Sequence, residues 1–289
     1  MTPMTQTADL PTGAEQITRN RPSGSTDSAN APRNPPIVAL ASPYGGASRL
    51  SSLLSDHPEL ACTSGTGLLP LCEQVMATWH KADGRDDGPP SRLAITATRA
   101  LTTSVIISVL AKEGKQRWCE FAAANAPAAE TFLRLFPGTR FLCLHRACPG
   151  VIRAALDASP WGIADPIFAP FTRAFPTSTI AALTAYWVAH TQALLKFEFA
   201  HPEACLRVRF EDLEGTEYET VQEVLAFLGI STTNRQPAPG ERNRQQATRK
   251  YSDPEAVLPV ELIPPGMLAQ ANDLLRQLGY PVLPAPVAK

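Results

Sequence analysis

Residues 37–60 read IVALASPYGGASRLSSLLSDHPEL, and this stretch decides the fold class. Its first five residues, 37–41, form a continuous apolar run, which is typical of a strand buried on both faces of a parallel sheet. A turn containing Pro and Gly follows at 42–47, and leucines at helical spacing then occupy 50–54. A strand, a glycine-rich turn and a helix in this order present backbone N–H groups and a helix N-terminus to an anion.

The rest of the chain repeats the alternation of strand and helix. Apolar runs at 140–144 and 206–210, with a shorter one at 117–119, predict further strands, and a Pro-rich loop is predicted from 160 to 176. Helical patterns occupy 68–79, 92–113, 126–135, 151–156, 179–200, 220–228 and 268–278. Gly229 and Gly279 close the last two helices. The pattern predicts one α/β domain over 36–289, with a central parallel sheet flanked by helices.

Composition narrows the functional classes. The formal net charge of −1 argues against a protein that mainly binds nucleic acid. No apolar run approaches the roughly 18–20 residues of a membrane span, and no secretory signal is evident, so a cytoplasmic protein without membrane attachment is expected. Residues 1–35 are rich in Thr, Ser, Pro, Asn and Gly without apolar periodicity, which predicts a disordered N-terminal tail.

The six cysteines predict neither a metal site nor a disulfide framework. None of them forms a CxxC pair, and no His/Cys cluster has zinc spacing. Cys143 and Cys205 lie within strand-like apolar runs, where they are expected to be reduced and buried. The glycine-rich turn also lacks the Lys of a nucleoside-triphosphate loop, which argues against kinase or ATPase chemistry.

Three distant segments, taken together, resemble the sulfotransferases that use 3′-phosphoadenosine-5′-phosphosulfate (PAPS). SPYGGASRLSSLLSDHPEL at 42–60 resembles their 5′-phosphosulfate loop and helix. RLFPGTRFLCLHRACPGVIRAAL at 134–156 resembles their 3′-phosphate strand, turn and helix, and CLRVRFEDLEGTEYETVQEVLAFLGI at 205–230 resembles a third shared segment. The likeness covers about 36–282, and the chain resembles a bacterial branch of the family associated with natural-product pathways. It implies a P-loop-like sulfotransferase fold, with PAPS as co-substrate and no metal.

The resemblance assigns the donor site to the first turn and to the end of the 140–144 strand. Arg146 matches the Arg that binds the 3′-phosphate, and Arg153 supplies charge one turn into the next helix. The remaining donor-binding positions are Tyr44, Gly45, Gly46, Ala47, Ser48, Ala154, Arg249 and Lys250. The last two belong to a basic segment that covers the adenosine 3′-phosphate in many relatives, although a solvated charge run would look the same.

Four positions depart from the family pattern. Tyr44 stands where the loop has a cation, and Ala154 where the 3′-phosphate site has a Ser. Gly65 stands where related sulfotransferases have a Glu base, and Phe121 where the branch has a Lys after the sequence WCE. Arg49, at the start of the first helix, is a candidate substitute for the loop cation.

Two residues are candidate bases for removing the acceptor proton. His145 precedes Arg146, and Glu120 ends the WCE sequence. A satisfied histidine at a strand end is the alternative interpretation of His145. Arg209, Glu211 and Asp212 match an R-[YF]-E-D pattern and are interpreted as structural, supporting the strand end and the next helix.

Three functions remain open at this point. The chain is an active sulfotransferase that modifies a hydroxyl of a small specialised metabolite, or an impaired subunit that pairs with an active sulfotransferase paralogue, or a repurposed enzyme of natural-product biosynthesis. A small-molecule acceptor, and either a homodimer or a heteromer with a paralogue, are the expected partners. Each lost charged group costs several kcal/mol of transition-state stabilisation, on the order of one preorganised donor.

Overall fold

The structure is a computed structural model that describes residues 34–82, 89–122, 126–159, 166–231 and 258–284. All of these residues lie within one compact unit, residues 32–289. The predicted tail at 1–35 falls almost entirely outside the described residues, as do the basic residues Arg249 and Lys250. Their assignments therefore stay predictions.

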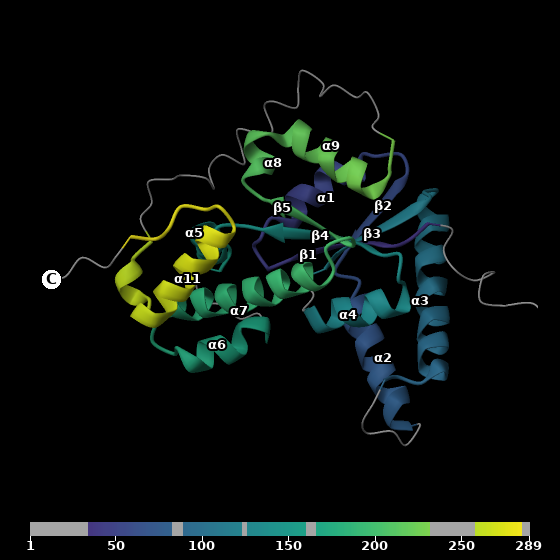
Figure 1. Cartoon of the computed structure of the whole chain (residues 1–289), viewed down its shortest axis with the longest axis horizontal. Coiled ribbons are helices and arrows are strands. Elements are labelled where there is room, and N and C mark those ends of the chain that lie inside the picture. Colours follow the sequence, from purple (N-terminus) through teal and green to yellow (C-terminus); the bar gives the residue numbers. More distant parts are fainter. Residues whose placement is uncertain (1–33, 83–88, 123–125, 160–165, 232–257, 285–289) are drawn as a thin grey trace, which may run out of the picture. The chain divides into compact units, whose positions relative to one another are not determined.

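A five-stranded parallel sheet forms the centre of the molecule, as the sequence predicts (Figure 1). The strands are β1 (Ile37–Ala41), β2 (Leu60–Ser64), β3 (Arg117–Ala122), β4 (Arg140–His145) and β5 (Cys205–Arg209). Their order across the sheet is β2-β3-β1-β4-β5, and every neighbouring pair is parallel. The predicted α/β fold class is confirmed.

The strand order places β1 at a topological switch point. The chain leaves β1 toward β2 and β3 on one side, and later returns to β4 and β5 on the other side. In open α/β sheets, ligands bind beyond the carboxyl ends of the strands where the order reverses in this way. The turn after β1 and the ends of β3 and β4 therefore surround the expected ligand position.

Helices cover both faces of the sheet. They are α1 (Ala47–Ser55), α2 (Leu68–Ala82), α3 (Arg92–Glu113), α4 (Ala126–Leu135), α5 (Cys148–Ala158), α6 (Ala169–Ala174), α7 (Thr179–Ala200), α8 (Asp212–Gly215), α9 (Glu217–Leu228) and α11 (Pro265–Gln277). Two short 3₁₀ turns, η1 (Pro166–Phe168) and η3 (Val260–Leu262), complete the described part. The predicted loop at 160–176 is wrong in its second half, because η1 and α6 fill it.

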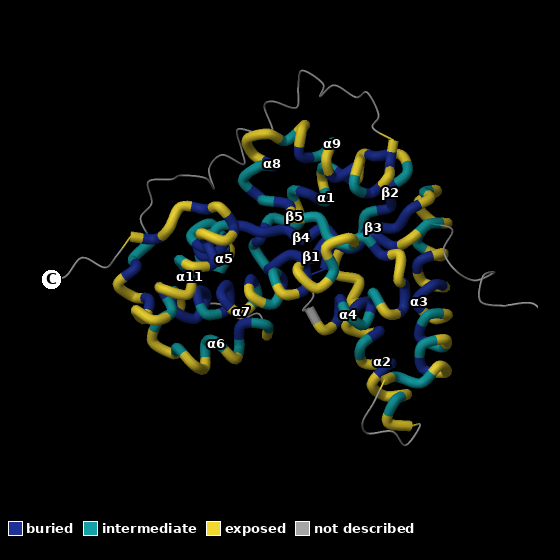
Figure 2. Tube along the Cα trace, viewed as in Figure 1, coloured by how far each residue is buried: buried dark blue, intermediate teal, exposed yellow. Residues whose placement is uncertain are grey.

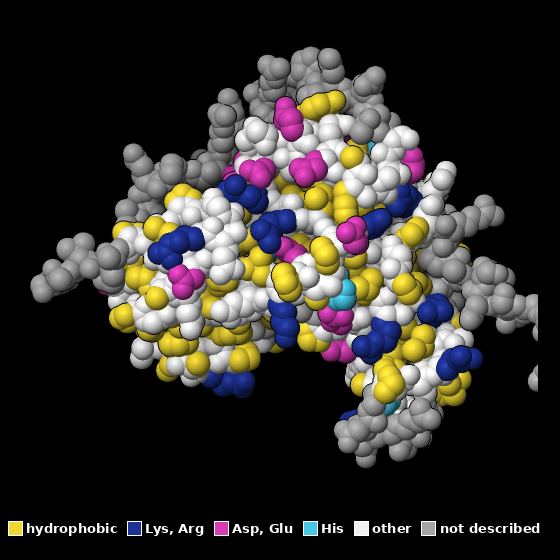
Figure 3. All heavy atoms as spheres, viewed as in Figure 1, with side chains coloured by type: hydrophobic (Ala, Val, Ile, Leu, Met, Phe, Trp, Pro, Cys, Tyr) yellow, Lys and Arg dark blue, Asp and Glu magenta, His cyan; other side chains and the backbone are white. Residues whose placement is uncertain are grey.

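Alternate residues of each central strand face opposite helical layers. Ile37, Ala39 and Leu142 pack with α1 and α9, whereas Val38 and Phe141 pack with α2, α4 and α7. Strands β1, β3 and β4 are accordingly deeply buried (Figure 2). On the side-chain surface, Lys and Arg are interspersed with acidic and apolar groups, without one continuous basic field on the visible face (Figure 3).

Helix α3 exposes large apolar side chains while it buries three threonines. Thr98, Thr102 and Thr103 are buried, whereas the outward-facing Leu101 and Ile107 are 46% and 48% exposed. Among the described helices, α3 alone is long and apolar enough to span a membrane by length and composition, and only 28% of its most apolar window is buried.

Candidate active site

The turn after β1 forms an anion cradle at the N-terminus of α1. Gly45 N–H donates to the Ser42 carbonyl at 2.9 Å, which closes the turn. Tyr44 and Gly46 then adopt left-handed φ angles of 62° and 96°, which reverse the chain into α1. The first turn of α1 contains no acidic residue, and its leading N–H groups point out of the helix end. These features favour binding of a phosphate or sulfate group.

Gly46 allows the aromatic ring of Phe210 to reach the loop. A Cβ atom at position 46 would lie only 2.0 Å from Cδ2 of Phe210, so only glycine fits there. Phe210 follows β5 directly, and its N–H donates to the His145 carbonyl at 2.8 Å. The ends of β4 and β5 therefore help to fix the shape of the loop.

Arg146 lies against the same loop, as the resemblance implies. Its Nη1 donates to the Tyr44 carbonyl at 2.8 Å, and its guanidinium carbon lies 4.0 Å from the centre of the Phe210 ring. Burial lowers the pKa of Arg146, while the nearby Glu211 acts in the opposite direction. Trp187 Nε1 donates to the Arg146 carbonyl at 3.0 Å and holds its backbone. A buried, immobilised guanidinium beside an anion cradle is suited to phosphate binding.

Tyr44, which replaces the loop cation, is integrated into the apolar core. Its ring stacks on Phe168 of η1 with centroids 6.2 Å apart, and the Phe168 ring meets Tyr186 of α7 edge-on at 4.6 Å. The position thus supplies packing between the loop and α7 in place of charge. The sequence shows the loss of the cation but not this packing role.

Arg49 does not offer the free cation that its predicted role requires. Its guanidinium forms an ion pair with Glu217 at the start of α9. The carboxylate already balances the charge in this arrangement. The substitution of Arg49 for the loop cation stays a prediction, and it requires that this ion pair open first.

Glu120 is occupied in holding the loop that follows β2. Its carboxylate accepts hydrogen bonds from the hydroxyl of Thr63 at 2.5 Å, and from the N–H and the hydroxyl of Thr66 at 2.9 and 2.8 Å. Trp118 Nε1 donates to the same Thr63 hydroxyl at 2.8 Å, and Glu120 is only 1% exposed. Glu120 thereby holds the loop that follows β2, and its role as a base stays a prediction.

Two further departures from the family pattern, Gly65 and Phe121, lie in that loop and on the neighbouring strand β3. Gly65 is exposed with a left-handed φ of 66°, and a Cβ there would meet nothing within 4 Å. Phe121 is buried at 4% exposure and packs with the core on the α1 side of the sheet. Neither the carboxylate nor the ammonium expected from the family therefore has a counterpart at these positions.

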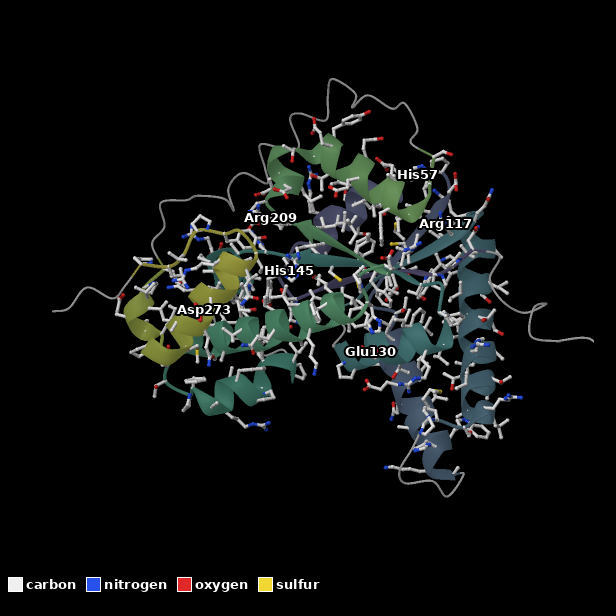
Figure 4. The ribbon with its side chains drawn as sticks, viewed as in Figure 1. His57, Arg117, Glu130, His145, Arg209 and Asp273 are labelled. Carbon is white, nitrogen blue, oxygen red and sulfur yellow. The ribbon has the colours of Figure 1, made fainter. Side chains whose placement is uncertain are left out.

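His145 is part of a buried charge network that sequence reasoning did not find. Its Nε2 lies 2.5 Å from Oε1 of Glu198, and Arg207 donates to Oε2 of the same carboxylate at 2.8 and 2.6 Å. Burial opposes ionisation of Glu198, but the hydrogen bonds and charges of His145 and Arg207 prevail and lower its pKa. His145 lies at the carboxyl edge of the sheet near Arg209, whereas Arg117 lies at the opposite edge (Figure 4).

Glu198 and Arg207 of this network line a pocket of about 610 Å³ beside β5. The residues lining it come from the end of α7, from β5 and from the end of α11: Leu195, Lys196, Glu198, Phe199, Pro202, Cys205, Arg207 and Gln277. This pocket is separate from the anion cradle, because none of residues 42–49 lines it. Glu198, which contacts His145, is one of the residues that line it.

The helix after β4 carries Arg153 and Ala154, both partly exposed, on the first turns beyond Arg146. The start of this helix is held by Glu211, whose carboxylate accepts from the Ala147 N–H at 3.0 Å and from the Tyr280 hydroxyl at 2.7 Å. Glu211 therefore supports the start of α5, whereas its side chain does not cap α8, the helix that follows it in sequence. No group of three metal-ligating side chains occurs among the described residues.

Comparison with known proteins agrees with this geometry. A family model described as "Sulfotransferase family" matches residues 35–234. The chain belongs to the sulfotransferase family. A Caenorhabditis briggsae protein named as a protein-tyrosine sulfotransferase is 24% identical over 190 residues, which cover 65% of this chain and 63% of that protein.

Solved sulfotransferase structures share the fold. The sulfotransferase domain of the Synechococcus PCC 7002 olefin synthase has a TM-score of 0.56 at 17% identity, covering 88% of this chain and 97% of that one. The sulfotransferase domain of the curacin biosynthetic pathway has a TM-score of 0.53 at 17% identity, covering 87% and 99%. A sulfotransferase from Mycobacterium avium has a TM-score of 0.50 at 12% identity, covering 89% and 80%.

His190 on α7 makes the stability of this member of the sulfotransferase family sensitive to mild acid. Burial and the positive charge of His145 lower the pKa of His190 to about 4, from an ordinary value of 6.5. Between pH 6.5 and 4, the unfolded chain therefore binds a proton at His190, whereas the folded chain does not. We expect the free energy of unfolding to fall by about 3 kcal/mol as the pH decreases from 6.5 to 4.

Urea titrations at half-unit pH intervals would measure this loss. His190→Phe keeps a ring on Tyr186, whose centroid is 5.7 Å away, and should remove most of the slope. His201→Phe, at the C-cap of the same helix, should retain it. An unchanged slope in His190→Phe would show that another group takes up the proton.

Proposed function

We propose that this chain transfers a sulfuryl group from PAPS to a hydroxyl of a small specialised metabolite. The observation that supports it best is the pairing of two anion-binding elements at one place. The N-terminus of α1, reached through Gly46, and the guanidinium of Arg146 meet at the Tyr44 carbonyl. Two phosphate-bearing ends of one donor need two such elements side by side.

The hydrogen-bonding and charged groups of the site fit the phosphate groups of PAPS better than they fit its reacting sulfuryl group. Backbone N–H groups of the loop and the hydroxyl of Ser48 are available for the 5′ end, and Arg146 for the 3′-phosphate. PAPS supplies an activated sulfuryl group when bound. Because Tyr44 is uncharged and Arg49 is paired with Glu217, charge on the moving group must be balanced mainly by helix α1 and its N–H groups.

His145 is the candidate base that the surrounding contacts favour. Its Nε2 is engaged by Glu198, so the ring is held in one orientation and Nδ1 is the nitrogen left to accept a proton. A carboxylate behind the imidazole also stabilises the charged ring that forms when it takes the proton. The proposal requires that the acceptor hydroxyl approach His145 from the carboxyl edge of the sheet.

A second candidate function, a subunit paired with a complete sulfotransferase, has its own support. The exposed apolar face of α3 and the occupied carboxylate of Glu120 are both consistent with a chain that works beside a partner. Such a chain would retain donor binding without turnover. The presence of a neighbouring gene for a complete sulfotransferase would favour it.

Calorimetric titration with PAP, the desulfonated product, tests the donor site directly. We expect micromolar binding, which Arg146→Ala weakens by about 10- to 100-fold through the loss of charged hydrogen bonds. Arg140→Ala is the matched control. Arg140 lies on the same strand over another aromatic ring, with its guanidinium carbon 5.2 Å from the centre of Phe227, but at the opposite edge of the sheet.

The outcomes separate the two candidates. Binding of PAP together with slow release of PAP from PAPS in the presence of hydroxyl-bearing acceptors supports the sulfotransferase. Binding of PAP without turnover by this chain alone, together with turnover when the paralogue is added, supports the subunit. Absence of PAP binding by the folded chain contradicts both.

A further inference from the structure

Strands β2 and β3 place two cysteines directly opposite each other. Cys62 and Cys119 are registered partners in this parallel pair. Neighbouring strands lie about 4.8 Å apart, which is inside the roughly 4.4–6.8 Å range of Cα separations in disulfides. Side chains of residues paired in this way point to the same face of the sheet, and both cysteines pack in the core beneath α1.

The two thiols differ in access and in reactivity. Cys119 is fully buried, whereas Cys62 is partly exposed. The interaction with Cys119 lowers the pKa of Cys62 against the effect of burial, with help from Ser55 and from the charge of Lys115. The thiolate is the form that reacts with oxidants. Since β2 is an edge strand, it can move toward β3 without breaking a second strand pairing.

We propose that Cys62 and Cys119 are an oxidation site that forms a reversible disulfide in hydrogen peroxide. The Cys62 thiolate attacks one peroxide oxygen, which breaks the O–O bond, yields the sulfenic acid and releases hydroxide. The Cys119 sulfur then displaces the sulfenic oxygen, which leaves as water after taking the thiol proton. Each thiol gives up one electron, and the peroxide is the two-electron acceptor.

The disulfide would act on the loop that Glu120 holds. Cys62 immediately precedes Thr63, and Cys119 immediately precedes Glu120, so the Thr63–Glu120 hydrogen bond of 2.5 Å is one residue from the new bond. Drawing β2 toward β3 changes the spacing on which the bonds from Thr66 to the same carboxylate depend. This inference goes beyond sulfuryl transfer and does not rest on it.

A second thiol pair provides an internal control. The thiols of Cys143 and Cys205 also interact. Their strands are registered so that Cys205 lies opposite Phe141, and Cys143 lies opposite Arg207. The cysteines are therefore diagonal neighbours, about 7–8 Å apart at Cα, which is beyond the roughly 7 Å that a disulfide can bridge.

Peptide mapping of the full chain after peroxide treatment tests the proposal. We expect a Cys62–Cys119 cross-linked peptide that disappears on reduction, and no Cys143–Cys205 peptide. Cys62→Ser should leave Cys119 as a free thiol. Cys119→Ala, a small apolar replacement in the core, should leave Cys62 as a sulfenic acid that dimedone traps at least about tenfold more than in the unaltered chain. Cys205→Ser should change nothing.

Hydrogen exchange measures the effect on the loop. In the oxidised chain, the amides of residues 64–67 should exchange at rates changed by about threefold or more, and Cys62→Ser treated identically should show no change. Absence of the cross-linked peptide, or oxidation of Cys62 to sulfinic acid beside a reduced Cys119, would overturn the oxidation site. Unchanged exchange in a cross-linked chain would overturn its action on the loop.

Discussion

Gly46→Ala is expected to destabilise the protein by about 4 kcal/mol, because two separate costs coincide at this position. The left-handed φ of 96° is strained for any residue with a side chain. In addition, the new Cβ would lie 2.0 Å from Cδ2 of Phe210, so the ring or the loop must move. Because the loop shapes the N-terminus of α1, we also expect PAP binding to disappear. Urea unfolding and calorimetry measure the two effects.

Gly67→Ala is the matched control. Its φ of 69° is also left-handed, but a Cβ there would meet nothing within 4 Å. It should cost only about 1 kcal/mol. A double-mutant cycle isolates the contact, since Gly46→Ala in a Phe210→Ala background should cost about 1–2 kcal/mol less than in the unaltered chain. Equal costs in the two backgrounds would mean that Phe210 does not set the requirement for glycine.

Glu198→Ala is expected to cost about 3 kcal/mol, because it leaves His145 buried without its carboxylate. The Glu198 side chain is only 9% exposed, and it bridges His145 to Arg207. Asp273→Ala is the control, since Asp273 and Arg276 form an exposed pair on α11 with 67% and 61% of their side chains accessible. It should cost less than about 1 kcal/mol. Similar losses in the two variants would contradict the buried network.

Acid titration provides an independent test of the same carboxylate. The folded-state pKa of Glu198 is lowered, so its contribution to stability is complete above the ordinary carboxyl pKa of 4.5 and is lost as the pH falls below that value. Glu198→Gln should therefore be less stable than the unaltered chain at neutral pH, and the difference should shrink in acid. A difference that stays constant down to pH 3 would assign the pH dependence elsewhere.

The sequence predicts the elements that have local signals. Helices α3, α4 and α7 begin and end where their periodicity indicates, and Gly229 ends α9 with a left-handed φ of 63°. Strand β2, Leu60–Ser64, was not predicted, because a short edge strand containing Cys, Thr and Ser lacks the continuous apolar run of β1. Helix α6 was missed within a Pro-rich stretch, where Pro170 occupies the first turn and is compatible with a helix.

The candidate site was predictable only where it resembles a local pattern. Gly46, Ser48 and Arg146 stand within motifs, and the structure brings the loop and Arg146 together. Glu198 and Arg207 were not found, because neither belongs to a motif and their contact with His145 depends on how α7 crosses the sheet. The pairing of Arg49 with Glu217 likewise joins residues 168 positions apart, which no local pattern encodes.

The Phe210 ring lies between Gly46 and the Arg146 guanidinium. Which residues are tolerated at one of these three positions therefore depends on the other two. A relative with a side chain at position 46 must also carry a smaller residue at 210, and that residue would leave the guanidinium without an aromatic neighbour. Substitutions at these sites should consequently appear together during divergence or not at all. The glycine of the loop is thus inherited jointly with the end of β5, although more than half of the chain separates them.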